Sequence, residues 1–170
     1  MSGGLADRVG HLEERLDHAE SVLALHELKA RYGELVDARF ARGGPVAPDL
    51  LADLARRAAD LFTEDGVWDA GPTLGVARGR DEIAARLAAP TLVFSRHLFV
   101  KPRLDVDGDR ATGRWDLLSP CTRPDGTSLW MAGYEDDVYE RVDGVWLHRS
   151  MTLTTLFISP AGTGWPKILA

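Results

Sequence analysis

Residues 25–40 read LHELKARYGELVDARF, and the rest of the chain is organised around this stretch. Apolar side chains recur in it at steps of three and four residues, namely Leu25, Leu28, Tyr32, Leu35 and Val36. This spacing places them on one face of a helix and predicts that the face packs against a core. Asp37 follows Tyr32 by about one and a half helical turns. We therefore expect the Asp37 carboxylate at the rim of any cavity that the Tyr32 face covers.

Two further helices are predicted on either side of this stretch. Residues 5–20 are mostly polar but carry a narrow apolar stripe, formed by Leu5, Val9, Leu12, Leu16 and then Leu23. Such a stripe is typical of a helix that packs on another helix or subunit. Glycines and a proline at residues 42–45 predict the end of the central helix, and a third helix is expected over about residues 48–61.

The sequence after Phe62 predicts strands. Residues 62–79 are dense in glycine around short apolar runs, which indicates a strand, a turn and a second strand, followed by a short helix from about Asp81. Four longer strands are expected over residues 93–106, 110–119, 128–141 and 145–158, because each gap between them holds a hairpin-type turn. Helices followed by such a meander predict an α+β fold, in which a curved antiparallel sheet wraps around the N-terminal helices.

Composition limits the domain count and the class of partner. A chain of 170 residues, 45% of them hydrophobic, predicts one domain over residues 1–170, with 1–20 as an N-terminal helical extension. A net charge of -6 argues against nucleic acid or an anionic membrane as partner, and favours a hydrophobic or weakly charged small molecule. The single cysteine, Cys121, and the absence of an apolar run at the amino terminus predict a cytoplasmic protein without signal peptide or membrane anchor.

Several motifs together resemble one family. They are FTEDGVWD at 62–69, GVARGRDEI at 75–83, RHLFVKPRLDVDGDRATG at 96–113 and GYEDDVYERVDGVWLHRS at 133–150, in addition to Tyr32 with Asp37. This set resembles the SnoaL-like branch of the nuclear transport factor 2 superfamily. The resemblance implies a cone-shaped, cystatin-like α+β barrel. It leaves the activity open, because this fold carries enzymes, non-catalytic subunits and binding modules.

Within that superfamily, the chemical pattern is similar to that of scytalone dehydratase and the bile-acid 7α-dehydratases. The resemblance implies catalytic roles for Tyr32, Asp37, His97 and Arg149. In this reading Asp37 orients His97, His97 takes a proton from the substrate, and Tyr32 donates a hydrogen bond to the oxygen on which charge develops. Strand alternation puts Phe99 on the side of His97, and Met151 on the side of Arg149.

The remaining candidates line the expected pocket. Flat aromatic rings suit a polycyclic ligand, so Trp68, Trp115 and Tyr134 are expected to contact substrate. Phe99, Asp136 and Met151 are expected to contact substrate as well. The alternative for Arg149 is a structural salt bridge to Asp136 or Asp37, since a lone buried arginine needs an anion. No HxxxH or HxH spacing favours a metal site, and we expect neither metal nor other cofactor.

The expected activity is that of a cofactor-independent dehydratase or isomerase acting on a polyketide-like, aromatic or steroid-like molecule. A polyketide cyclase would use the same residues. Two alternatives come from another class. One is a non-catalytic subunit similar to the small subunit of ring-hydroxylating dioxygenases, and the other is a small-molecule-binding module. The stripe on residues 5–23 and apolar residues on the outer face of the sheet predict a homo-oligomer, either a dimer or a trimer.

Overall fold

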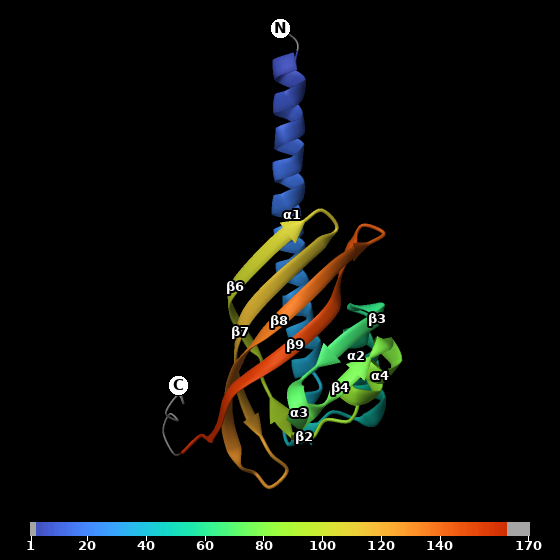
Figure 1. The fold of residues 1–170 in the computed structure, drawn as a ribbon. Coiled ribbons are helices and arrows are strands. Elements are labelled where there is room, and N and C mark those ends of the chain that lie inside the picture. Colours follow the sequence, from blue (N-terminus) through green and yellow to red (C-terminus); the bar gives the residue numbers. More distant parts are fainter. Residues whose placement is uncertain (1–2, 163–170) are drawn as a thin grey trace.

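The first helix, α1, runs without a break over Gly3–Asp37 in the computed structural model, which describes residues 3–162. We expected two helices here, over residues 5–20 and 25–40. Residues 20–24 read ESVLA and contain neither glycine nor proline, so nothing interrupts the helical hydrogen bonds between them. The first half of α1 extends beyond the sheet, and the second half lies behind it (Figure 1).

The apolar face predicted for the second half of α1 is buried. Each of its five residues is at most 7% exposed, these being Leu25, Leu28, Tyr32, Leu35 and Val36. The helix ends at Asp37, and the short antiparallel strands β1 (Phe40–Ala41) and β2 (Gly44–Pro45) follow it. Gly43 lies in their turn with a φ of 102°, a conformation that side chains other than glycine rarely adopt.

The helix α2 (Pro48–Ala59) begins with proline and has Asp49 in its first turn, both of which favour a helix start. Strand β3 (Phe62–Asp69) comes next and is joined to β4 (Val76–Arg78) by one short helix, α3 (Gly71–Leu74). The predicted short helix is α4 (Gly79–Leu87). The prediction of strand, turn, strand and helix in this region is therefore confirmed.

The predicted meander consists of one two-residue strand followed by four long strands. They are β5 (Phe94–Ser95), β6 (Leu98–Asp107), β7 (Arg110–Thr122), β8 (Ser128–Val142) and β9 (Val145–Pro160). The strand order is β4-β3-β9-β8-β7-β5, with β6 also paired to β7. The first expected strand is thus two strands, and the break between them holds His97.

The sheet differs from the expected antiparallel barrel in two respects. Strand β3 pairs with β9 in parallel, so the sheet is mixed. No hairpin links these two strands, because residues 70–144 lie between them, and turn geometry therefore does not impose an antiparallel pair. The sheet is curved but does not close, since β4 and β5 are its two edges (Figure 1). The α+β cone itself is confirmed.

The core lies between the second half of α1, the inner face of the sheet, and the helices α2 and α4. It is mainly aliphatic and aromatic, with Phe62, Ile83 and Met151 almost fully buried. Of the helices in the described residues, none combines the length and the apolar character that crossing a membrane requires.

Candidate active site

A cavity of about 400 Å³ opens where α1 ends and where β5, β7, β8 and β9 meet. Its lining is mostly apolar, from residues such as Leu74, Leu87 and Leu129. Three of the predicted site residues line it, namely Tyr32, Trp68 and His97. A concave, largely apolar site with a few polar groups is the usual form of a small-molecule site.

Asp37 and His97 make the predicted contact. The Nδ1 atom of His97 lies 2.7 Å from Oδ1 of Asp37. The backbone N–H of His97 also donates to the same carboxylate, at 3.0 and 3.3 Å, because the break between β5 and β6 turns this amide toward α1. Arg96 adds an ion pair, with Nε 3.3 Å from Oδ2. The carboxylate is therefore fixed from three directions, and the imidazole is held with Nε2 as its remaining ring nitrogen.

Tyr32 lies on the inner face of α1 and is paired with Trp68. The indole Nε1–H of Trp68 donates to the Tyr32 hydroxyl oxygen at 2.9 Å. Burial raises the pKa of Tyr32 above its usual range, and the negative charge of Glu135 adds to this effect. Tyr32 therefore keeps its proton, and because its oxygen already accepts from Trp68, that proton can be donated to a ligand.

Three predicted binding residues lie deeper than the cavity. Phe99 stacks on the His97 ring, with centroids 5.9 Å apart, and so packs behind the imidazole. Trp115 is buried, and its Nε1–H donates to the Tyr139 hydroxyl at 2.9 Å. Met151 is 1% exposed and belongs to the core. These side chains support the site but are not among the residues that line its cavity.

Arg149 does not lie where strand alternation predicted. In the pairing of β8 with β9, Tyr139 faces His148 and Val138 faces Ser150, so Arg149 is one extra residue, a β-bulge. His148 consequently points into the core, and Arg149 points outward, with Nη1 donating to the Asp65 carbonyl and Nη2 3.0 Å from the Asp65 carboxylate. The expectation that Arg149 belongs to the site is therefore wrong.

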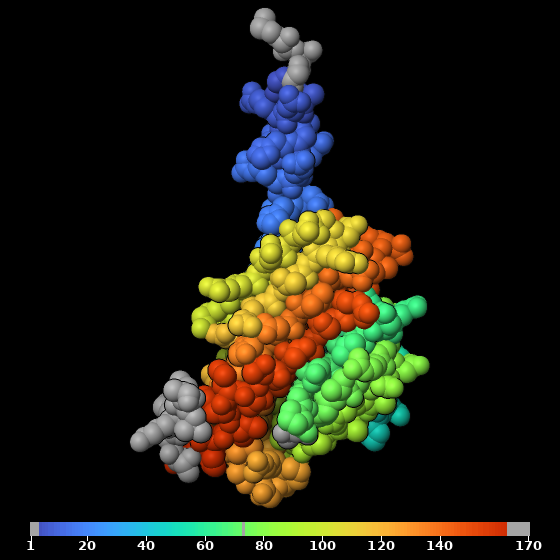
Figure 2. Space-filling view, in the orientation of Figure 1, coloured from blue at the N-terminus to red at the C-terminus, as the bar shows by residue number. Residues whose placement is uncertain are grey.

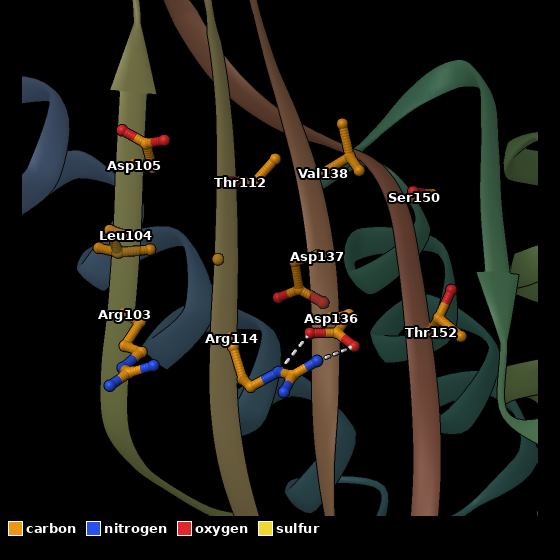
Figure 3. A pocket seen from close by; sticks show the side chains of 11 residues that line it. Arg103, Leu104, Asp105, Thr112, Arg114, Asp136, Asp137, Val138, Ser150 and Thr152 are labelled. Carbon is orange, nitrogen blue, oxygen red and sulfur yellow. Dashed lines mark hydrogen bonds and ion pairs between the residues drawn. The ribbon is translucent and has the colours of Figure 1, made fainter.

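Tyr134 and Asp136 also face away from the cavity. Asp136 forms a two-point ion pair with Arg114, at 2.6 and 2.8 Å, and the Arg114 guanidinium lies over the Tyr134 ring. The pair lies in an open depression on the outer face of the sheet, beside Thr112 and Thr152 (Figure 3). The inward-facing residues of β8 are instead Glu135, Asp137 and Tyr139, so the two predicted roles are wrong.

These inward residues form a buried polar group that we did not predict, here called the deep cluster: Lys29, Glu135, Asp137, Tyr139 and Trp115. Lys29 Nζ donates to Glu135 at 2.5 Å and to Asp137 at 2.7 Å, and Tyr139 donates to Asp137 at 2.7 Å. Burial alone would lower the pKa of Lys29, but the two carboxylates outweigh it and raise that pKa. The sequence does hold a signal, because Lys29 is four residues after Leu25 on the apolar face of α1.

Arg39 and Arg86 are further cavity residues that we did not predict. Arg39 is only 8% exposed, although it follows α1 directly and would be taken for a surface cation at a helix end. It does serve that end, since its Nε donates to the Val36 carbonyl. Burial lowers the pKa of Arg39, while Tyr32 and Asp37 act in the opposite direction.

No set of three or more histidine, cysteine, aspartate or glutamate side chains within residues 3–162 lies close enough together to hold a metal ion. The histidine of the site, His97, has one acid beside it, Asp37, and that acid is occupied by Arg96 and by a backbone amide. The chemistry to be explained is therefore that of an imidazole, a carboxylate and a phenol.

A curved sheet around one long helix, with a histidine–aspartate pair inside the cone, defines a protein of the nuclear transport factor 2-like class. The chain belongs to the SnoaL-like domain family, whose pattern matches residues 17–152. The resemblance seen in the sequence is thereby confirmed. No curated protein matches the chain.

Solved structures with the same fold include a dehydrochlorinase, a protein named LinA and a putative dehydratase. A hexachlorocyclohexane dehydrochlorinase, LinA Type2, superposes with a TM-score of 0.72 at 23% identity, covering 89% of this chain and 97% of its own. A second structure, named LinA, has a TM-score of 0.70 at 25% identity with the same coverage. A putative scytalone dehydratase from Novosphingobium aromaticivorans has a TM-score of 0.66 at 20% identity, covering 87% and 97%. These likenesses establish the fold.

Proposed function

We propose that this protein is a cofactor-independent lyase that removes a proton and a leaving group from neighbouring carbons of a small organic substrate. The observation that carries the proposal is the contact of 2.7 Å between His97 Nδ1 and the Asp37 carboxylate, in the wall of a mostly apolar cavity. An imidazole whose Nδ1 hydrogen is held by a carboxylate has Nε2 unprotonated, and the carboxylate stabilises the imidazolium that forms.

The reaction balances with the groups present. His97 Nε2 takes a proton from a carbon, the electron pair of that C–H bond forms the new double bond, and the leaving group departs with its own bonding electrons. Tyr32 donates a hydrogen bond to the oxygen or other atom on which negative charge grows. The proton on His97 then passes to the departing group or to solvent, which restores the starting state.

The structural neighbours support an elimination in particular. One of them is named as a dehydrochlorinase and one as a putative scytalone dehydratase, and both names describe loss of a small group with formation of a double bond. A purely structural subunit has no need of a histidine–aspartate pair and a phenol around one cavity, so the site favours an enzyme over a non-catalytic subunit.

Asp37→Asn is the sharpest test. The asparagine side chain would donate its N–H to Nδ1, which moves the ring proton to Nε2 and removes both the base and the charge. We expect turnover to fall by about 10²- to 10⁴-fold, the range for acid–base groups. The assay is proton NMR in D₂O over a panel of β-hydroxy and β-chloro carbonyl compounds, which detects both the alkene product and deuterium exchanged into the substrate.

Melting curves separate catalysis from structure. A catalytic pair predicts that Asp37→Asn and His97→Gln melt close to the parent, while a structural pair predicts a loss of about 3–5 kcal/mol in both. Asp60→Asn is the matched control, because it neutralises an exposed carboxylate at the end of α2. Parental turnover by Asp37→Asn on any compound that the protein converts would exclude the mechanism.

A further inference from the structure

The charges around the cavity point to the chemistry of its ligand. Three arginines line it, Arg39, Arg86 and Arg123, whereas no aspartate or glutamate of the described residues does. The chain as a whole carries a net charge of -6. A cationic cavity in an acidic protein is a local feature that overall charge does not explain, and it attracts anions.

Arg39 contributes most to this positive charge, because it is buried and has no ion-pair partner among the described residues. Its Nε and Nη1 donate to the Val36 and Leu87 carbonyls at 2.9 and 2.7 Å, which orients the guanidinium but places no carboxylate against it. Within residues 3–162, no carboxylate lies within ion-pair distance of it. Asp37, the nearest acid in the sequence, is bound to His97 and Arg96 instead. A buried charge without a partner is strongly unfavourable unless an anion joins it.

Arg86 repeats the arrangement beside Arg39, whose Nη1 donates to the carbonyl of the next residue, Leu87. It comes from α4, and its Nε donates to the Leu74 carbonyl at 2.7 Å. Here too the described residues provide no carboxylate partner. The two guanidinium groups are close enough for Arg86 to lower the pKa of Arg39 by charge repulsion. Two like charges are thus held near each other by main-chain carbonyls, at the wall of an apolar cavity.

We propose that the substrate is an organic acid, whose carboxylate binds Arg39 and Arg86 while its apolar body fills the cavity toward His97. Planar guanidinium groups match a carboxylate in shape and charge, so this pairing gives both affinity and orientation. The inference deepens the proposed function by naming the substrate class, and it replaces the expectation of a weakly charged ligand. Binding can be measured without turnover.

The test compares two probes of the same shape, 2-naphthoate and its neutral amide, 2-naphthamide. Titration is followed by isothermal calorimetry and by tryptophan fluorescence, to which Trp68 in the cavity lining contributes. We expect the parent to bind naphthoate at least about tenfold more tightly than the amide. Arg39→Gln should weaken naphthoate by about 10- to 100-fold, as for loss of a hydrogen bond to a charged group, and leave the amide unchanged.

Controls separate charge from structure. Arg42→Gln removes an exposed arginine three residues along the chain and should change neither affinity. Arg86→Gln should weaken naphthoate alone, and it carries the test if Arg39→Gln does not fold. Equal affinity of the parent for the two probes, equal weakening of both by the arginine variants, or no binding of either would overturn the proposal. Asp37→Asn should still bind naphthoate, so failure of the lyase mechanism would be seen separately.

A different observation supports a second inference, about the free half of α1. This half extends beyond the sheet and contacts it at its base through Asp17 and Arg141 (Figures 1 and 2). Its apolar stripe is 44–70% exposed and comprises Leu5, Val9, Leu12, Leu16 and Leu23. With Ala19 included, the steps alternate between four and three residues, which is the heptad pattern of a coiled coil.

The flanking charges indicate what covers the stripe. In each heptad the first core position is Val9 or Leu16 and the second is Leu12 or Ala19. Arg8 and Arg15 directly precede the first core position, and Glu13 and Glu20 directly follow the second. In a parallel pair of identical helices, each of these arginines faces a glutamate of the other copy, five residues further along. In an antiparallel pair, arginine would face arginine and glutamate would face glutamate.

The contact between α1 and its own sheet does not cover this apolar stripe, the seam of the expected coiled coil. Asp17 accepts from Arg141 at 2.8 Å, and Asp17 lies one residue after the core position of Leu16, off the seam. We infer that two copies of this chain associate through a parallel two-stranded coiled coil over this half of α1. A helix of this length is marginal alone in water, and a partner would supply the missing apolar contacts.

Charge reversal tests partner and orientation together. Light scattering should return twice the chain mass of 18.6 kDa for the parent. Glu13→Lys with Glu20→Lys should weaken the dimer at least about tenfold, since four attractions become repulsions, and adding Arg8→Glu with Arg15→Glu should restore it. Asp7→Lys with Glu14→Lys is the matched control, because both positions lie off the seam, and it should leave dimer formation unchanged. A monomer or trimer, an equal effect of the control, or no rescue would overturn the inference.

Discussion

At the deep end of the cone, Lys29 donates to two carboxylates, while at the cavity end the hydrogen bonds of Arg39 within the described residues go to carbonyls. Both cations are buried, at 1% and 8% exposure. They differ in what neutralises their positive charge. The deep cluster neutralises its cation internally, and the cavity leaves its own cation to be neutralised by something that enters.

This difference distinguishes structural from functional burial of charge. A buried cation with internal partners contributes to one specific packing, and removing it leaves anions behind. A buried cation without such partners is kept at the expense of stability, which is common where a ligand has to bind. Changes in the deep cluster should therefore appear in the free energy of unfolding, and changes at the cavity end in binding and turnover.

The largest effect is expected from Lys29→Met. The substitution keeps the length of the side chain but leaves Glu135 and Asp137 without a cation in the core, so unfolding should become easier by about 3–5 kcal/mol. Urea denaturation at pH 7 measures it. Lys101→Met is the control, because Lys101 pairs with Asp116 on the surface and its side chain is 77% exposed. Equal losses in the two variants would show that the deep cluster does not stabilise the fold.

A smaller, pH-dependent effect is expected from His148, which packs against the same end of the cone. Neither ring nitrogen has a hydrogen-bond partner among the described residues, and the nearest carboxylate oxygen, of Asp137, is 3.9 Å away. Burial lowers the pKa of His148 from 6.5 to about 3. As the pH falls below 6.5 the unfolded chain takes up this proton first, so stability is fully present above that pH and is lost toward pH 3.

The corresponding measurement compares urea denaturation at pH 7 and pH 5. The parent should lose about 2 kcal/mol more than His148→Leu over this interval, because the variant has no proton to take up. His11→Gln is the control, since His11 is exposed on the free half of α1. Parallel losses in the parent and in His148→Leu would mean that His148 is not the group responsible.

How well the sequence predicts the positions of these side chains differs between the helix and the strands. Helical spacing placed Tyr32 and Asp37 correctly, because α1 is regular and its apolar face is continuous. His97 came from the family resemblance and not from spacing, and its predicted contact with Asp37 is present at 2.7 Å. The turns containing Gly108 and Gly144 also fixed the hairpins, since glycine there has positive φ.

Strand alternation was less reliable, for two physical reasons. On β9 the bulge at Arg149 exchanges the faces of the strand, and no residue type marks it in the sequence. On β8 the inward residues include Glu135 and Asp137, which hydrophobic patterning assigns to solvent. Only the lysine of another element, Lys29, makes their burial possible, and that pairing spans more than a hundred residues.

The smallest effect, and the most direct comparison of the two regions, comes from two tryptophans that make the same bond. Trp68 donates to the Tyr32 hydroxyl and Trp115 to the Tyr139 hydroxyl, each at 2.9 Å. Replacing either by phenylalanine removes the indole N–H and the same number of ring atoms, so the two variants lose equal volume. If the cavity end is functional, Trp68→Phe frees the Tyr32 hydroxyl to turn away from the substrate, and turnover should fall about five- to tenfold, equivalent to about 1 kcal/mol in the barrier.

Trp115→Phe should leave turnover near the parental value and instead lower the free energy of unfolding by about 1 kcal/mol, because its bond lies in the deep cluster. The measurement is turnover and urea denaturation on both variants, and a fall in turnover with Trp115→Phe as large as that with Trp68→Phe would show that the two ends of the cone are not separate in function.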